Sequence, residues 1–158
     1  MKTIVLGVGN KILGDDGVGI HVVNEVKKHT KNNQHITVDE AQTGGMNLLD
    51  LILGYDKAII VDAVKNKDAK EGEIKRIPLS DFDTMHSCNP HDVSLIEAID
   101  LAEKMGEDRI PEEIIVIAIM MKQLPCEFKE TLSEKISSAV PKAAELTLNE
   151  LRKENISN

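Results

Sequence analysis

The chain has 158 residues, a length that favours one domain with its own hydrophobic core. Acidic residues outnumber basic ones by 27 to 19, and the net charge of −8, without a basic cluster, argues against nucleic-acid binding. No apolar run is long enough to cross a bilayer, so we expect no membrane insertion. The sequence has two cysteines, Cys88 and Cys126, and no signal peptide, which leads us to expect a protein of the reducing cytoplasm.

The first part of the chain alternates short apolar runs with helical patterns. A buried strand is predicted at Thr3–Gly7 and is followed by a helix that opens at Asp15 or Asp16 and ends near His29. The next predicted elements are a strand, a short helix and a second buried strand, at Gln34–Glu40, Asn47–Leu53 and Lys57–Asp62.

The second part continues the alternation. Polar and apolar residues alternate at Gly72–Ile77, which predicts a half-exposed strand at a sheet edge. Asn89 and Pro90 predict the start of a helix to about Met105, because asparagine is a favoured N-cap and proline a favoured first residue. A buried strand at Glu113–Met120 follows. Thr131 and Glu134 then have the spacing of a capping box, which predicts a last helix to about Lys153.

Strands that alternate with helices in this way indicate an α/β fold. We expect one domain over residues 1–158, a doubly wound three-layer α/β/α sandwich. Its sheet should have about five mostly parallel strands, with one antiparallel strand at an edge. Ligands of such open sheets bind in the crevice at the carboxyl ends of the strands.

Three residues with metal-binding side chains, Asp16, Asp62 and His91, follow predicted strands or open a predicted helix. Two carboxylates and a neutral imidazole are suitable ligands for a divalent transition metal such as nickel. The helix dipole should keep His91 neutral. Each residue also has an ordinary structural role available, since Asp16 could cap a helix, Asp62 could turn the chain and His91 could bond its own turn. Their expected convergence at one sheet edge favours the metal.

A nucleotide site is a weaker interpretation of the same region. Gly7 and Gly9 follow the first strand as in a dinucleotide-binding fingerprint, but Ile12 occupies the position of the third glycine. Two carboxylates at the helix entrance would also repel a pyrophosphate. Of these two acids, Asp15 is expected only to cap the helix.

Four ordered segments resemble the [NiFe]-hydrogenase maturation endopeptidases. These segments are Gly9–Gly19, Thr43–Leu49, Ile59–Ala63 and Pro90–Leu95. The resemblance implies a protease that removes a C-terminal extension from a [NiFe]-hydrogenase large-subunit precursor after nickel has been inserted. It maps the metal-contacting residues of the family onto Asp16, Asp62 and His91, with nickel supplied by the precursor rather than bound tightly by the protease.

One segment departs from the family pattern. Relatives often have an aspartate and two glycines before the threonine, whereas here Asp39-Glu40-Ala41-Gln42 precedes Thr43. Glu40 is the closest counterpart of that aspartate. We therefore count Glu40 with Asp16, Asp62 and His91 as the candidate catalytic residues.

The sequence leaves the mechanism open. A carboxylate such as Asp16 or Glu40 could activate water, or the metal could polarise the carbonyl or supply hydroxide. A third route uses Cys88 as a nucleophile, which requires a partner that lowers its pKa. Two other functions also stay open: a non-proteolytic maturation chaperone that binds metal or partner, and an unrelated hydrolase with its own tightly bound metal. In each case the loops Asp39–Gly45 and Ser80–Asn89 should flank the crevice.

Overall fold

The computed structural model describes residues 1–42, 45–82, 95–123 and 128–153. These residues contain a five-stranded sheet whose strands are β1 (Thr3–Val8), β2 (Ile36–Ala41), β3 (Lys57–Lys65), β4 (Ile74–Pro78) and β5 (Glu113–Met121). The strand order is β2-β1-β3-β5-β4. All neighbouring strands are parallel except β4, which runs antiparallel to β5 at the edge. The predicted mostly parallel sheet with one antiparallel edge strand is confirmed.

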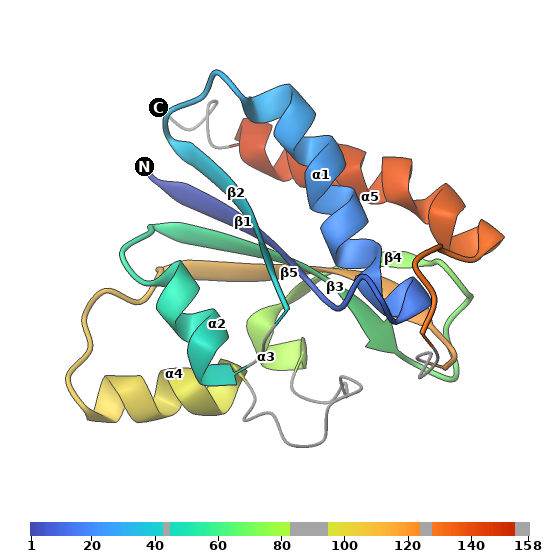
Figure 1. Cartoon of the computed structure of the whole chain (residues 1–158). Coiled ribbons are helices and arrows are strands. Elements are labelled where there is room, and N and C mark those ends of the chain that lie inside the picture. The colour runs from blue at the N-terminus through green and yellow to red at the C-terminus, as the bar shows by residue number, and fades with distance from the viewer. Residues whose placement is uncertain (43–44, 83–94, 124–127, 154–158) are drawn as a thin grey trace.

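Helices cover both faces of the sheet and make a three-layer structure (Figure 1). On one face lie η1 (Gly14–Gly17), α1 (Val18–Thr30) and α5 (Glu134–Lys153). On the other lie α2 (Gly45–Ile52), α3 (Leu79–Phe82) and α4 (Leu95–Lys104). None of the helices within the described ranges has the length and apolar character needed to span a membrane.

The central strand β3 explains why its sequence is an almost continuous apolar run. Ile59 and Val61 pack on the side of α1 and α5, whereas Ala58 and Ile60 pack on the side of α2 and α4. A strand that is buried on both faces needs apolar residues at every position. The sheet therefore divides the core into two hydrophobic clusters, and the parity of a residue in β3 decides which cluster it joins.

The position of Asp62 differs from the prediction. We expected β3 to end at Asp62, but the strand continues to Lys65. On one side, β1 pairs with β3 only as far as Gly7 and Val61, so Asp62 is the first residue of β3 beyond that pairing. On the other side, Asp62 pairs with Ala118 of β5. Asp62 thus lies at a step in the sheet, at the carboxyl end of β1.

The helix starts also differ from their predictions. The first helix opens with the 3-10 turn η1 before α1 begins at Val18. The capping box led us to expect the last helix directly after Thr131, but α5 begins at Glu134 and Ser133 precedes it. α3 was not predicted. The predicted helix start at Asn89 and Pro90 lies outside the described residues, where α4 is first seen at Leu95.

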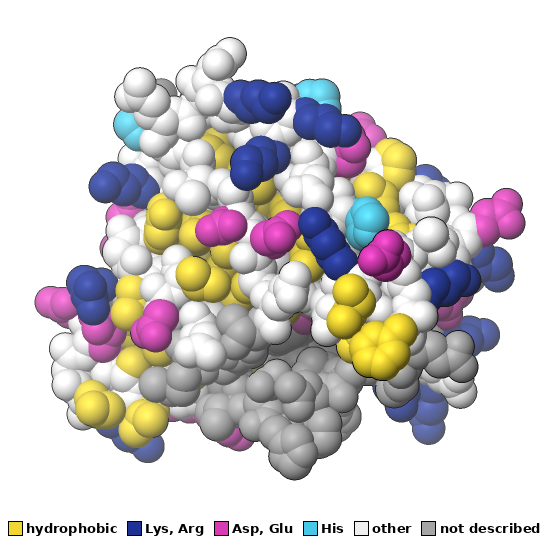
Figure 2. All heavy atoms as spheres, viewed as in Figure 1, with side chains coloured by type: hydrophobic (Ala, Val, Ile, Leu, Met, Phe, Trp, Pro, Cys, Tyr) yellow, Lys and Arg dark blue, Asp and Glu magenta, His cyan; other side chains and the backbone are white. Residues whose placement is uncertain are grey.

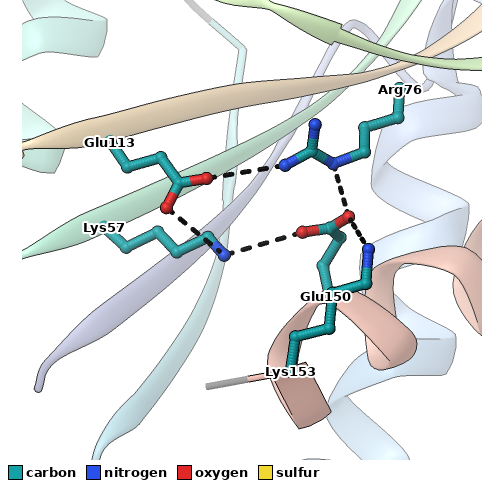
Figure 3. Close-up of polar contacts among 5 residues, drawn as sticks. All are labelled: Lys57, Arg76, Glu113, Glu150 and Lys153. Atoms are coloured by element: carbon teal, nitrogen blue, oxygen red, sulfur yellow. Dashed lines mark hydrogen bonds and ion pairs between the residues drawn. The ribbon is translucent and has the colours of Figure 1, made fainter. Parts of the chain in front are cut away.

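A cluster of ion pairs joins α5 to the end of the sheet where β3 and β5 begin (Figure 3). Its centre is Glu150, which is only 1% exposed and pairs with Arg76, with Lys57 at 3.6 Å and with Lys153 at 3.1 Å. Lys57 and Arg76 also pair with Glu113. Burial raises the pKa of Glu150, but the hydrogen bonds from Arg76 and Lys153 outweigh it and leave the pKa below its usual value.

Candidate functional site

The loop that follows β1 holds Asp16 in a fixed turn. The backbone N–H of Asn10 donates a hydrogen bond of 2.9 Å to Oδ2 of Asp16. Gly9 makes this turn possible, because its φ of 147° suits glycine and a Cβ at this position would lie 2.1 Å from the carbonyl oxygen of Asp16. The glycine-asparagine pair of the sequence motif therefore has a structural role: it places the chain directly against the acid.

A second glycine brings this turn against the sheet. A Cβ on Gly19 would lie 2.3 Å from the carbonyl oxygen of Val61 and 2.7 Å from that of Val8. The start of α1 consequently packs against the backbone at the carboxyl end of β1 and at the middle of β3. Since Asp16 precedes this helix and Asp62 follows Val61, the two acids come to the same place.

Burial raises the pKa of both carboxyls, and the Asp16 carboxylate also acts on Asp62. Asp62 is 7% exposed, and its burial raises its pKa well above the usual value. The nearby Asp16 carboxylate raises the pKa of Asp62 further, against a smaller lowering by the N–H of Ala63. Burial also raises the pKa of Asp16, although the hydrogen bond from Asn10 opposes the shift. Two neighbouring carboxylates are unfavourable unless a proton or a cation lies with them, so this pair is suited to bind a metal ion.

Glu40 lies near the loop but on a different face. It is opposite Gly7 in the pairing of β2 with β1, and its Oε2 is 3.5 Å from Nζ of Lys11. It follows Ile36 and Val38 at alternate positions of β2, which pack with the cluster under α1 and α5. Because side chains alternate along a strand, Glu40 leaves the sheet on the face opposite to Asp62. Its catalytic role stays a prediction.

The remaining candidates lie outside the described residues. These are His91, which we expect to be the third metal ligand, Cys88, and the loop residues Thr43 and Gly44. In the described parts of the chain, no three side chains of His, Cys, Asp or Glu form a group that could hold a metal ion. The structure thus brings together two of the three predicted ligands, and the full ligand set of Asp16, Asp62 and His91 remains a prediction.

Asp15 has a role that the sequence did not indicate. We expected it to cap its own helix, but neither η1 nor α1 has a side-chain cap. Instead, its carboxylate accepts hydrogen bonds from the backbone N–H of Ser133 at 2.7 Å and from Oγ of Ser133 at 2.8 Å. An acid in front of the start of α5 also interacts favourably with that helix dipole. Asp15 therefore fastens the Asp16 turn to the last helix.

Comparison with known proteins gives matches that cover most of the chain. The sequence profile of the hydrogenase maturation protease family HycI matches residues 20–150. The chain is 30% identical over 154 residues to a Methanocaldococcus jannaschii protein whose name assigns it provisionally to these proteases, with coverage of 95% of this chain and 96% of that protein.

Two Escherichia coli comparisons agree. The chain is 23% identical over 158 residues to the hydrogenase 2 maturation protease, covering 99% of this chain and 94% of that protein. The solved structure of the hydrogenase maturating endopeptidase HybD matches with a TM-score of 0.79 at 23% identity, covering 98% of this chain and 94% of that chain. This likeness establishes a common fold.

Proposed function

The chain belongs to the hydrogenase maturation protease family, and we propose that it is the endopeptidase that removes a C-terminal extension from a [NiFe]-hydrogenase large-subunit precursor. The observation that carries the proposal is the pair of acids, Asp16 and Asp62, at the carboxyl end of β1, where its pairing with β3 stops. No resident metal is required, because the nickel belongs to the precursor. We place this reaction in the cytoplasm, in keeping with a sequence that has no disulfide framework.

Nickel in the precursor is the feature that the site recognises. The raised pKa of Asp62, caused by burial and by the Asp16 carboxylate, means that the ionised pair is unfavourable when no cation is near. A divalent ion that arrives with the substrate offsets the repulsion between the two carboxylates. His91 completes the ligand set as a neutral imidazole. Precursor without nickel lacks this docking point and escapes cleavage.

Docking at nickel would fix the scissile peptide bond beside the same acids. Hydrolysis adds water to the carbonyl carbon, breaks the C–N bond and transfers a proton to the leaving amine. Asp16 is the preferred base to take the proton of that water, since Glu40 pairs with Lys11 and leaves the sheet on the other face. The protease is thus of an aspartic type in which the nickel of the substrate provides recognition.

The test uses purified precursor in nickel-loaded and nickel-free forms, with intact mass as the readout for loss of the C-terminal peptide. The wild type should cleave only the nickel-loaded form. Asp16→Asn should lower the rate by about 100-fold or more, whereas Asp100→Asn, exposed on α4, should leave it unchanged.

Each competing function has its own signature in these experiments. Equal cleavage of nickel-free precursor would refute the recognition of nickel. Tight binding of nickel-loaded precursor without cleavage would identify a non-proteolytic maturation chaperone. Stoichiometric metal in the purified protease would instead support a hydrolase with its own metal ion.

A further inference from the structure

Two exposed hydrophobic side chains form a patch beside the site. Ile12 is 45% exposed and Phe128 is 83% exposed. Their segments pair in parallel through a bridge between Leu13 and Lys129, in which the N–H of Lys129 donates to the carbonyl of Ile12 at 2.7 Å. The bridge therefore brings the backbones of Ile12 and Phe128, the residues that precede it, close together. We refer to these two side chains as the Ile12–Phe128 patch.

The patch is continuous with the turn that holds Asp16. The backbone N–H of Asp16 donates a hydrogen bond of 3.3 Å to the backbone carbonyl of Leu13, the residue that follows Ile12. In Figure 1 the segment that leads into α5 runs beside the loop after β1. Hydrophobic side chains reach the surface in the same part of the molecule in Figure 2. A chain bound at Asp16 can therefore reach the patch.

The exposure of Phe128 is unusual for this sequence. The chain has only two phenylalanines, one tyrosine and no tryptophan, yet one of the phenylalanines is almost fully exposed next to the site. An aromatic side chain buries about 150–250 Å² when a partner covers it, and such residues dominate the energetics of protein interfaces. A solvated phenylalanine at this position is best explained by a partner that covers it during function.

A second copy of the chain does not fit as that partner. A stable interface buries about 800 Å² on each side, and two side chains supply only a fraction of this area. A substrate segment fits better, because its main attachment is elsewhere. Ile12 and Asp16 are four positions apart in the chain, so their Cα atoms are at most about 14 Å apart. An extended substrate covers this distance in about four residues.

We propose that the Ile12–Phe128 patch binds an apolar side chain of the precursor that lies within about four residues of the scissile bond. The inference rests on the proposed function and adds a subsite to it. Phe128 provides the contact surface and takes no part in the bond cleavage. Its contribution should therefore be to binding of the substrate and of the transition state alike.

The chain offers a matched control for the test. Leu101 and Met105 are 49% and 78% exposed and lie one helical turn apart at the end of α4, the end that leads into the beginning of β5. They are thus at the opposite end of the sheet from Asp16. Met105→Ser removes a hydrophobic side chain of comparable exposure and leaves the Ile12–Phe128 patch unchanged.

The experiment compares the kinetics of Phe128→Ser and Met105→Ser with those of the wild type on nickel-loaded precursor. Phe128→Ser should raise KM about tenfold with little change in kcat, as expected for loss of uniform binding by an aromatic anchor. Phe128→Leu should restore part of the affinity, and Met105→Ser should match the wild type. Thermal unfolding should be the same for all four proteins, since Phe128 is outside the core.

A second series changes the substrate. Serine in place of the apolar precursor residues near the cut should raise KM for the wild type and have little further effect in Phe128→Ser, because both changes remove the same contact. Unchanged KM in Phe128→Ser overturns the subsite and leaves the proposed function intact. Absence of wild-type cleavage overturns both. A wild-type dimer that becomes monomeric in Phe128→Ser would assign the patch to a second copy and refute the proposal.

Discussion

Replacing Asp62 with asparagine should abolish processing and at the same time stabilise the folded protein. Burial and the Asp16 carboxylate both raise the pKa of Asp62, so its ionised form is unfavourable in the folded state. Each pKa unit corresponds to about 1.4 kcal/mol. Asparagine has nearly the same shape without the charge, and we expect the free energy of unfolding to rise by about 1–2 kcal/mol. For a chain of this size, Tm should increase by about 2–8 °C.

The pH dependence follows from the direction of this shift. An acid with a higher pKa in the folded than in the unfolded protein favours folding below the unfolded value, here 3.8, and this advantage is lost as pH rises through the folded pKa. The difference in Tm between Asp62→Asn and wild type should therefore be absent below 3.8 and should grow as pH rises from there through the raised pKa of Asp62 in the folded protein. Thermal unfolding at several pH values, with Asp100→Asn as the control, measures it. An Asp62→Asn protein less stable than wild type at pH 8 would refute the reasoning.

Four further substitutions test the contacts that hold the fold and the Asp16 turn in place. Glu150→Gln should lower the free energy of unfolding by about 3 kcal/mol, measured by urea-induced unfolding at pH 7. Since the bonds from Arg76 and Lys153 outweigh burial and lower the pKa of Glu150, this loss should fade as pH falls through that pKa. Asp15→Asn and Ser133→Ala should each cost about 1 kcal/mol by thermal unfolding, with non-additive effects in the double variant because they share two hydrogen bonds. Gly19→Ala should lower stability by about 1–3 kcal/mol in the same assay, because its Cβ would be 2.3 Å from a carbonyl oxygen.

The order of the elements was predictable because hydrophobic periodicity is a local property. The apolar runs of β3 and β5 and the alternation of β4 identify a buried centre and an exposed edge without any knowledge of contacts. The error at Asp62 has a physical cause. A single acid after an apolar run looks like a strand end, but Asp62 stays in β3 because β5 continues to pair with it while β1 has stopped. The sequence of one strand does not show how far each of its neighbours pairs with it.

The meeting of Asp16 and Asp62 was predictable from topology, whereas the contacts and side chains around them were not. Parallel strands bring the chain after β1 and the end of the β1–β3 pairing to the same edge, which is why Asp16 and Asp62 meet. The bond between Asp15 and Ser133 joins residues 118 positions apart, and no local pattern distinguishes Asp15 from an ordinary helix cap. The exposure of Phe128 was equally hidden, since a phenylalanine in a short segment is normally expected in the core.

Buried carboxyls at the two ends of the sheet have pKa values shifted in opposite directions. This contrast supports a functional role for Asp16 and Asp62. At one end, Glu150 has lysine and arginine partners that hold its pKa below the usual value despite burial. At the other end, burial and a second acid raise the pKa of Asp62. Ion-pair chemistry that stabilises a buried carboxylate is thus present in this fold, yet the acid at the carboxyl end of the sheet is placed beside a like charge. Such an arrangement destabilises the folded protein, and a cation between the two carboxylates, which we propose comes with the substrate, would make it favourable.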